Sequence, residues 1–238
     1  LRRYIDRIGY SNTFTIYDTD DVKSVIKDIC KKFNIDTKML KEKTIMNAIS
    51  HAKDELMSPD QMELEAGGDY NGKRIANVYR EYQKTLKLNN ALDFDDLIVK
   101  TVELFRVDAQ VLDYYQERFR YIMVDEYQDS NFIQEALLSA VSGEEDGRWN
   151  RFMVGDIKQS IYGFRQAKPE IFIERKNEYK RFNEENPEYP ATIILDRNFR
   201  SRFEVCDAVN FIFERIMTKE SAKMEYNSDE RLVNGAEF

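Results

Sequence analysis

Apolar residues recur at helical spacing through the first third of the chain. One such stripe is formed by Val22, Val25, Ile26, Ile29 and Phe33. It predicts a helix with Thr19 as its N-cap. Further helices are expected at about residues 37–56, after Ser58-Pro59, and along the stripe at 75–86. Residues 10–90 are therefore predicted to form a small, all-helical unit.

Beyond residue 90 the pattern changes to short apolar runs that end in acids. The run 121–124 leads into Asp125-Glu126, and the run 151–154 leads into Gly155-Asp156. Runs of this kind are typical of buried parallel strands. The other expected elements are a helix with Asp93 as its N-cap, helices near 109–118, 131–141, 169–183 and 205–217, a third strand at 191–195 and a turn at 198–201.

The order strand, helix, strand favours a parallel sheet. The predicted fold class is α/β, with a helical subdomain followed by part of a parallel sheet with flanking helices. We expect three parts, namely residues 1–91 as the helical subdomain, 92–190 as the sheet with its acidic strand ends, and 191–238 as the start of a further subdomain.

The composition narrows the classes of function. A formal net charge of −8 argues against a globally basic nucleic-acid binder, although a local groove remains compatible with it. A single histidine, His51, and two distant cysteines, Cys30 and Cys206, argue against zinc sites and Cys/His catalysis and indicate a reducing, cytoplasmic location. The sequence shows no signal peptide or membrane-length apolar run, and its start at Leu1 suggests an excised piece.

One stretch in the helical part imitates a phosphate-binding loop. Gly67-Gly68-Asp69-Tyr70-Asn71-Gly72-Lys73-Arg74 nearly matches the pattern GxxxxGK[ST]. Arg74 replaces the hydroxyl residue that would reach Mg²⁺, and the preceding residues 62–66 do not form a buried strand, which the motif requires. We therefore expect a glycine-containing loop between helices.

The acids after the first predicted strand form a candidate site. Ligands bind at the carboxyl ends of strands in open α/β sheets. Asp125 could hold Mg²⁺ there, and Glu126 could orient or deprotonate an attacking water. The stretch by itself is equally consistent with carboxylates that merely face solvent.

The segment after the second predicted strand carries the aromatic residues Tyr162 and Phe164 beside Arg165. Aromatic faces next to a cation suit single-stranded nucleic acid, because stacking contributes about 1–3 kcal/mol per base. The rings are also consistent with core residues beneath a loop. Arg200 is either an arginine finger or an ordinary surface cation.

Three stretches become specific when they are taken together. They are Asp125-Glu126-Tyr127-Gln128-Asp129, Gly155-Asp156-Ile157-Lys158-Gln159-Ser160-Ile161-Tyr162-Gly163-Phe164-Arg165 and Asn198-Phe199-Arg200-Ser201. They resemble motifs II, III and IV of superfamily 1 DNA helicases of the UvrD/PcrA/Rep type. Leu92-Asp93-Phe94-Asp95-Asp96-Leu97 resembles another segment of that family. From residue 151 onward the chain looks closer to AddA, a helicase–nuclease subunit.

The resemblance implies a site for ATP and Mg²⁺. Asp125 would bind the metal, and Glu126 would activate the hydrolytic water. Gln159 would sense the γ-phosphate and couple it to the DNA loop that follows. Arg200 would contact the γ-phosphate from across the cleft, and Phe199, which replaces a frequent tyrosine, could stack on adenine.

The resemblance also implies DNA partners. Tyr162, Phe164 and Arg165 would hold single-stranded DNA, including at single-strand/double-strand junctions. A nuclease subunit would be a further partner if the protein is AddA-like. The implied activity is that of an ATP-dependent 3′→5′ DNA helicase or translocase in repair or recombination.

The three predicted parts also have counterparts in that family. Residues 1–91 would correspond to the helical subdomain 1B, 92–190 to the second half of the RecA-like subdomain 1A, and 191–238 to the start of subdomain 2A.

Several family motifs are not found in these 238 residues, namely the Walker A loop, the adenine-recognising Gln motif, and motifs V and VI. Without the Walker A lysine we expect no useful ATP hydrolysis by this chain alone, and weak, salt-sensitive DNA binding. Three alternatives stay open: an AddA-type helicase–nuclease piece, a non-enzymatic DNA- or partner-binding scaffold, and a different Mg²⁺-dependent phosphohydrolase that uses Asp125, Glu126 and Asp156.

Overall fold

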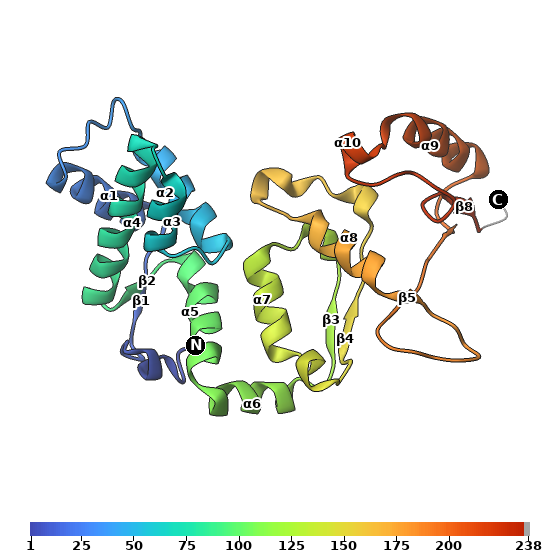
Figure 1. The fold of residues 1–238 in the computed structure, drawn as a ribbon, viewed down its shortest axis with the longest axis horizontal. Helices are drawn as coiled ribbons and strands as arrows, with labels where there is room; N and C mark the ends of the chain where they lie inside the picture. The colour runs from blue at the N-terminus through green and yellow to red at the C-terminus, as the bar shows by residue number, and fades with distance from the viewer. Residues whose placement is uncertain (236–238) are drawn as a thin grey trace.

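The computed structural model describes residues 1–235, apart from the side chain of Arg165. The chain starts in a helical unit, continues along α5 (Phe94–Val107) and α6 (Ala109–Arg118), and then enters a part that contains short parallel strands (Figure 1). This arrangement confirms the predicted α/β fold class, with helices first and parallel strands afterwards. No helix among the described residues is both long and apolar enough to cross a membrane.

Four helices share the core of the helical unit. They are α1 (Thr19–Lys32), α2 (Glu42–Asp54), α3 (Pro59–Ala66) and α4 (Tyr70–Leu88). The buried core residues include Ile26, Ile29, Ile45, Ile49, Val78, Tyr82 and Leu86. Those from α1 and α4 belong to the stripes that the sequence pattern predicts, and Ile45 and Ile49 come from α2. The unit therefore has an apolar core of its own.

Two helix starts differ from the predictions. The N-cap of α1 is Asp18, not Thr19, because the Asp18 carboxylate accepts the backbone N–H groups of Asp20 and Asp21. The second helix starts at Glu42, not near residue 37. There the Asp36 carboxylate accepts the N–H of Lys38 (2.9 Å), and such a local side-chain bond competes with helix formation.

The glycine-rich stretch that imitates a phosphate loop is only partly a loop. Gly67 and Gly68 link α3 to α4, and Asp69 caps α4 by accepting the N–H of Asn71 (3.0 Å). The following residues, up to Arg74, form the first turns of α4. Ser58 caps α3 with Pro59 in the first turn, as predicted.

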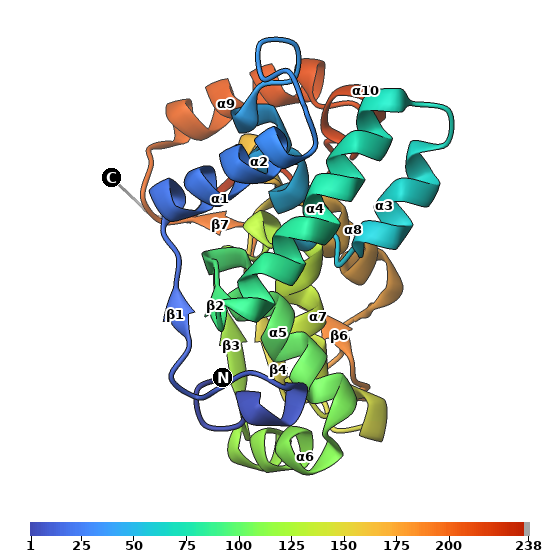
Figure 2. The same cartoon turned by 90° about the vertical axis from the view of Figure 1, so that its left-hand side faces the viewer.

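A short parallel strand pair joins the two ends of the helical unit. Strand β1 (Thr15–Ile16) pairs with β2 (Ala91–Leu92). Figure 2 shows the two strands side by side below the helices. Leu92 is buried with Ile5, Tyr10 and Phe14 in a second small core.

A second parallel pair forms the sheet that carries the acidic strand ends. Strand β3 (Ile122–Val124) pairs with β4 (Arg151–Met153), and α7 (Phe132–Val141) makes the crossover. Ile122 packs towards Val141 of α7. The opposite face is open, since Met123 is 79% and Phe152 57% exposed. The prediction of fully buried strands is thus wrong for this face, because the crossover helix packs against the other face.

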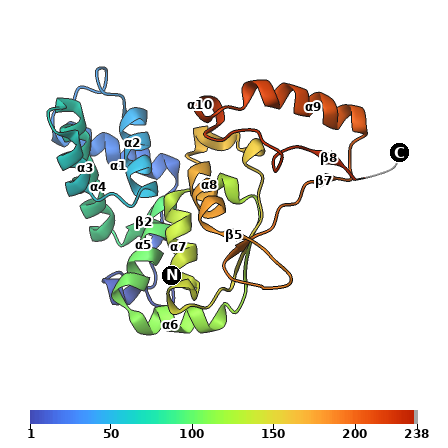
Figure 3. The ribbon, with the colours of Figure 1, turned by 45° about the vertical axis from the view of Figure 1, so that its right-hand side comes forward.

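The remaining elements form two further parallel pairs and three helices. They are α8 (Pro169–Glu178), β5 (Lys180–Arg181), β6 (Ala191–Thr192), β7 (Arg197–Asn198), α9 (Phe203–Ile216), α10 (Lys219–Ala222) and β8 (Val233–Asn234). Strand β5 pairs with β6, and β7 with β8. Figure 3 shows β7 and β8 side by side near the C-terminal end.

This last part corrects three predictions. Helix α8 ends at Glu178 instead of residue 183, because the chain extends into β5. The third strand covers only Ala191–Thr192, and it pairs with β5 instead of extending the β3–β4 sheet. Helix α9 begins at Phe203, two residues before the predicted start.

Candidate functional site

The carboxylates of Asp125 and Glu126 are exposed directly after β3. Asp125 Oδ1 accepts the N–H of Glu126 at 2.9 Å. Glu126 has φ +54°, a left-handed conformation that is uncommon for residues other than glycine. The next residue, Tyr127, donates its N–H to the carbonyl of Val154 at 2.9 Å. The sharp turn thus places both acids at the carboxyl edge of the sheet.

Gln128 connects the two acidic strand ends. Its side chain is buried, with 2% exposure. Oε1 accepts the N–H of Asp156 at 3.0 Å, and Nε2 points to Glu126 Oε2 at 3.3 Å. Because a backbone N–H can only donate, the Asp156 contact fixes which end of the amide faces Glu126. Gln128 therefore links the first acidic turn to the second.

The second acidic turn is a closed set of hydrogen bonds. Asp156 Oδ1 lies 2.8 Å from Lys158 Nζ, and Gln159 Nε2 donates to Asp156 Oδ2 at 3.0 Å. Burial would raise the pKa of Asp156, but Lys158 and Gln159 outweigh it and lower that pKa below its ordinary value. Gln159, the predicted phosphate sensor, is therefore held by its neighbouring carboxylate.

Tyr127 anchors the first turn from the helix side. Its hydroxyl donates to Glu135 Oε2 at 2.5 Å, and Glu135 also pairs with Arg151 (2.7 Å) and Arg175 (2.6 Å). Burial would raise the pKa of Glu135, but the bonds from Arg151, Tyr127 and Arg175 bring it down to about 2. The carboxylate is thus ionised at neutral pH, and it holds the Tyr127 hydroxyl in place.

A cavity of about 810 Å³ collects most of the predicted nucleotide-site residues. Asp125, Glu126, Asp156 and Gln159 line it from the strand ends, and residues 189–196 and 229–232 form other parts of its wall. Among the described lining residues neither of the two predicted motif IV side chains is found. The structure brings the acids and Gln159 together but leaves the motif IV residues outside.

The motif IV residues lie in the turn after β7. The Asn198 side chain accepts the N–H groups of Arg200 and Ser201, each at 2.9 Å, which confirms the predicted turn. Arg200 is exposed, and the ring of Phe199 is 66% exposed. A Cβ on Gly235 would lie 2.7 Å from that ring. Phe199 therefore packs beside the last described residue, and its nucleotide role stays a prediction.

The predicted DNA-contact residues form one exposed turn, Tyr162–Arg165. The rings of Tyr162 and Phe164 lie 5.8 Å apart at 52°. Phe164 is 78% exposed and Tyr162 37%, so the interpretation as core residues beneath a loop is wrong. The side chain of Arg165 lies outside the described part of the structure. Two neighbouring rings thus lie at the surface of one turn.

The exposed carboxylate of Asp125 fits a Mg²⁺ ion that is shared with a nucleotide. Mg²⁺ in such sites usually takes one or two carboxylates together with phosphate oxygens and water. Within residues 1–235, His, Cys, Asp and Glu form no group of three or more that could hold a metal by themselves. A metal at Asp125 would thus depend on phosphate oxygens.

Sequence reasoning missed three residues that hold this site together. Gln128 belongs to a motif of the sequence, but the sequence does not show that it is the buried link between the two acidic turns. Gly155 leaves room for that link, since a Cβ there would lie 2.5 Å from Gln128 Oε1. Glycine at a strand end was the available signal. Glu230, near the C-terminal end of the described chain, pairs with Lys158 at 3.2 Å. No pattern in the sequence around Glu230 predicts this contact.

The chain is similar in sequence to known DNA helicases. Residues 1–180 match the family described as the UvrD/REP helicase N-terminal domain. The chain is 42% identical over 214 residues to the ATP-dependent DNA helicase PcrA of Staphylococcus epidermidis, which covers 90% of this chain and 28% of that protein. The protein of the same name from Staphylococcus aureus is similar to the same extent. The chain thus spans about 28% of the length of these relatives. Because the family match extends over most of its length, the chain belongs to the UvrD/REP helicase family.

Proposed function

We propose that this chain supplies the water-activating part of an ATP site and a single-strand-binding loop to an ATP-dependent 3′→5′ DNA helicase or translocase in DNA repair or recombination. One observation carries the proposal. The acids at the ends of two parallel strands, Glu126 and Asp156, are joined through Gln128 and line one cavity. The family membership of the chain supports it.

Each residue at the acidic edge has a proposed part in ATP hydrolysis. Asp125 would hold Mg²⁺, which neutralises charge on the transferred phosphate when it is bound. Glu126 would orient the hydrolytic water and take its proton. Gln159 would report the γ-phosphate to the DNA loop, three residues further along the chain. To do so it would exchange its bond with Asp156 for one to the nucleotide.

The motif IV residues would complete the site from outside the cavity. Arg200 would stabilise the charge of the transition state, and Phe199 would stack on adenine. Both are exposed and lie in one capped turn. Movement of the segment that carries β7 toward β3 and β4 would bring them to the nucleotide.

Single-stranded DNA, including single-strand/double-strand junctions, is the proposed partner of Tyr162, Phe164 and Arg165. We also propose that the chain divides into a 1B-like part (1–91), the second half of subdomain 1A (92–190) and the start of subdomain 2A (191–238). The buried thiols Cys30 and Cys206 support a reducing, cytoplasmic location.

The stacking role predicts a loss of DNA affinity when both rings are removed. Tyr162→Ala/Phe164→Ala should weaken binding of a fluorescent oligo-dT at least tenfold, since each stack contributes about 1–3 kcal/mol. Fluorescence anisotropy at low and moderate salt measures this change. Tyr70→Ala removes an exposed ring of α4 and serves as the control. Equal affinity of wild type and double variant would exclude the stacking role.

The site composition predicts that these 238 residues by themselves do not turn over ATP. They contain no Walker A loop, whose lysine holds the β- and γ-phosphates. Phosphate release with saturating single-stranded DNA should therefore stay at background, with and without Glu126→Gln. Robust turnover that Glu126→Gln abolishes would contradict this expectation, while it would support the role of Glu126.

A second candidate function is a non-enzymatic DNA- or partner-binding scaffold. The position of Phe199 and Arg200 outside the acidic cavity favours it for the chain acting alone. An AddA-type protein, with a nuclease subunit or domain as partner, remains the other proposal within the enzyme class. DNA binding without ATP turnover is expected from the scaffold.

A further inference from the structure

Three successive residues at the C-terminal end of α2 contact different parts of the structure. Lys53 points into the core between α4 and α5, Asp54 faces the start of α7, and Glu55 faces the start of α8. These residues belong to the helical unit, whereas α7 and α8 flank the acidic turns and the DNA loop. The end of α2 is therefore a junction between the two parts.

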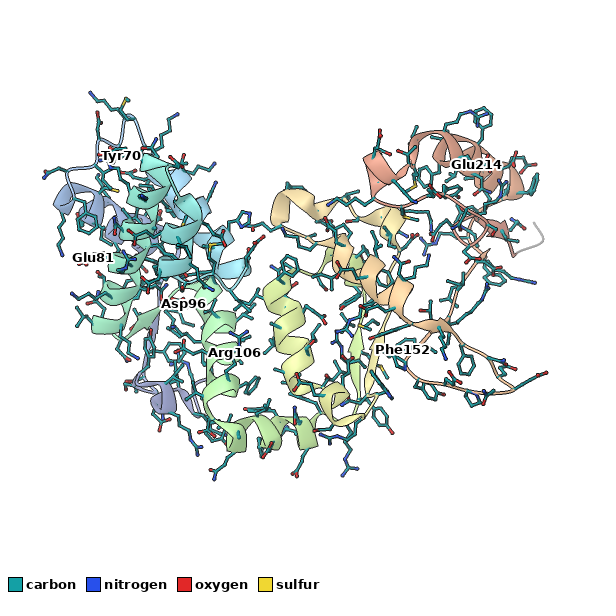
Figure 4. All side chains as sticks on the ribbon, viewed as in Figure 1. Tyr70, Glu81, Asp96, Arg106, Phe152 and Glu214 are labelled. Carbon is teal, nitrogen blue, oxygen red and sulfur yellow. The ribbon has the colours of Figure 1, made fainter. Side chains whose placement is uncertain are left out.

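Lys53 fixes this junction from inside. Its side chain is 0% exposed, and Nζ lies 2.5 Å from Asp93 and 2.9 Å from Asp96. The Tyr82 hydroxyl donates to the same Asp93 oxygen at 2.8 Å. Figure 4 places Asp96 where α5 meets the helical unit. A buried charge with two buried partners has little freedom to shift, so α2 is held firmly against α4 and α5.

The next two residues, Asp54 and Glu55, contact the part of the chain that contains β3 and β4. Asn131 Nδ2 donates to Asp54 Oδ1 at 3.3 Å, and Asn131 is the N-cap of α7. Glu55 Oε1 lies 2.9 Å from Lys168 Nζ, with both side chains less than one third exposed. Lys168 directly precedes α8, and its Nζ also lies 5.3 Å from the centre of the Phe132 ring.

Backbone bonds from Lys168 and its neighbour Ala167 reach motif II and the exposed turn. The Lys168 N–H donates to the carbonyl of Ser130, directly after motif II, at 2.8 Å. The preceding residue, Ala167, donates its N–H to the carbonyl of Tyr162 at 3.3 Å. The bond from Ala167 thus closes the exposed turn Tyr162–Arg165. The bond from Lys168 connects the following residues to the end of the segment that carries motif II.

We propose that the end of α2 is a positioning element for the DNA loop: Glu55 holds Lys168, and Lys168 sets the loop Tyr162–Arg165 relative to motif II. The helical unit would thereby influence DNA affinity through an ion pair. This inference rests on the proposed DNA role of Tyr162 and Phe164.

Glu55→Gln tests the inference, because two roles of Lys168 predict opposite results. If Glu55 positions Lys168, oligo-dT binding should weaken about three- to tenfold, as expected for loss of a partly buried charge pair. If Lys168 instead binds a phosphate and Glu55 merely shields it, removal of the acid should tighten binding. Tighter or unchanged binding overturns the proposal. Glu65→Gln, an exposed acid of α3, controls for the change in net charge.

A charge exchange provides the second measurement. Lys168→Glu alone should weaken binding, and Glu55→Lys/Lys168→Glu should restore it to within about threefold of wild type by re-forming the pair. An affinity that stays at the level of Lys168→Glu overturns the proposal. Urea unfolding of each variant shows that the comparison is made between folded proteins.

Amide hydrogen exchange separates failure of this inference from failure of the proposed function. In Glu55→Gln the Lys168 amide should exchange at least tenfold faster, while the amide of Ile26 in the helical core is unchanged. If Tyr162→Ala/Phe164→Ala binds DNA like wild type, the proposed DNA role of the loop is wrong. The exchange rate of the Lys168 amide then still tests whether Glu55 positions Lys168. Unchanged exchange at Lys168 overturns it in either case.

Discussion

Gly155 lies where the two acidic strand ends come closest. A Cβ at this position would be 2.5 Å from Gln128 Oε1, 2.9 Å from Phe172 Cε1 and 3.2 Å from the backbone nitrogen of Tyr127. Two of these neighbours are fixed by hydrogen bonds of their own, through Gln128 to Asp156 and through Tyr127 to Val154. No side chain fits there without a shift of the acidic edge of the sheet.

Gly155→Ala should accordingly destabilise the protein by about 1–3 kcal/mol, as overpacking of a fixed site does. Urea unfolding followed by circular dichroism measures the difference. Gly68→Ala is the matched control, because a Cβ on Gly68 meets nothing within 4 Å. Equal loss of stability in the two variants would show that the close approach is unimportant.

The sequence allowed the placement of the acids to be predicted, but not their local geometry. Asp125 and Glu126 follow an apolar run, so their position at a strand end could be read directly. The left-handed backbone of Glu126 could not, because glutamate has no special preference for it and the turn is imposed by the bond from Tyr127 to Val154. The buried position of Gln128 depends equally on contacts between distant segments.

Among the elements, α2 shows how burial changes a carboxylate at a junction. Burial raises the pKa of Asp54 to about 6, and the nearby Asp95 adds to the effect. The other charged groups that influence it are His51 and Glu55 on the same helix end. The folded protein thus binds a proton at Asp54 more tightly than the unfolded chain, whose pKa is near the ordinary value of 3.8.

This raised pKa predicts that Asp54→Asn stabilises the protein at neutral pH. The wild type loses stability as pH rises from about 4 to 6, because the buried carboxyl must ionise. Asparagine removes that loss and can still accept from Asn131, so the gain above pH 6 should be about 1 kcal/mol after allowance for solvent screening. Urea unfolding between pH 4 and 8 measures it, with Asp113→Asn on the exposed face of α6 as control. A gain that does not depend on pH would contradict the explanation.

The elements with strong periodic patterns or caps were predictable, and the short strand pairs were not. Capping groups at Ser58, Asp93 and Asn131 begin helices as their residue types favour. Strands β5 to β8 contain two residues each, which is too short for an alternation of apolar and polar positions to mark them, and β5 and β7 also carry charged side chains. Their pairing is set by which segments the tertiary structure brings together.

At the scale of the whole molecule, burial is concentrated in the helical unit. Its core contains side chains with 0% exposure, such as Ile26, Val78 and Tyr82. Around β5 and β6, by contrast, the strand residues are exposed or half-buried. Large apolar side chains such as Leu195 and Phe203 also remain exposed. Local stability should therefore differ strongly along the chain.

Native-state hydrogen exchange should show this difference directly. The amides of Val78 and Tyr82 in α4 should exchange at the rate set by global unfolding, because opening them disrupts the apolar core. The amides of Phe182, directly after β5, and of Thr192, in β6, should exchange at least a hundredfold faster. A uniform protection along residues 1–235 would instead indicate one cooperative unit.

Because β1 pairs with β2, the helical unit between them enters and leaves the rest of the structure at one place. The chain leaves through Tyr17 and returns through Asn90, and hydrogen bonds tie these points to the partner strands, from Tyr17 N–H to Leu92 and from Thr15 N–H to Asn90. A protein engineer could therefore exchange the intervening helices for another module. Because the two strands run parallel, a hairpin turn cannot replace the helices between them, and the shortest substitute is a crossover of about a dozen residues. The inserted module would also have to supply a cation for Asp93 and Asp96, because their ion-pair partner Lys53 would be removed with the helices.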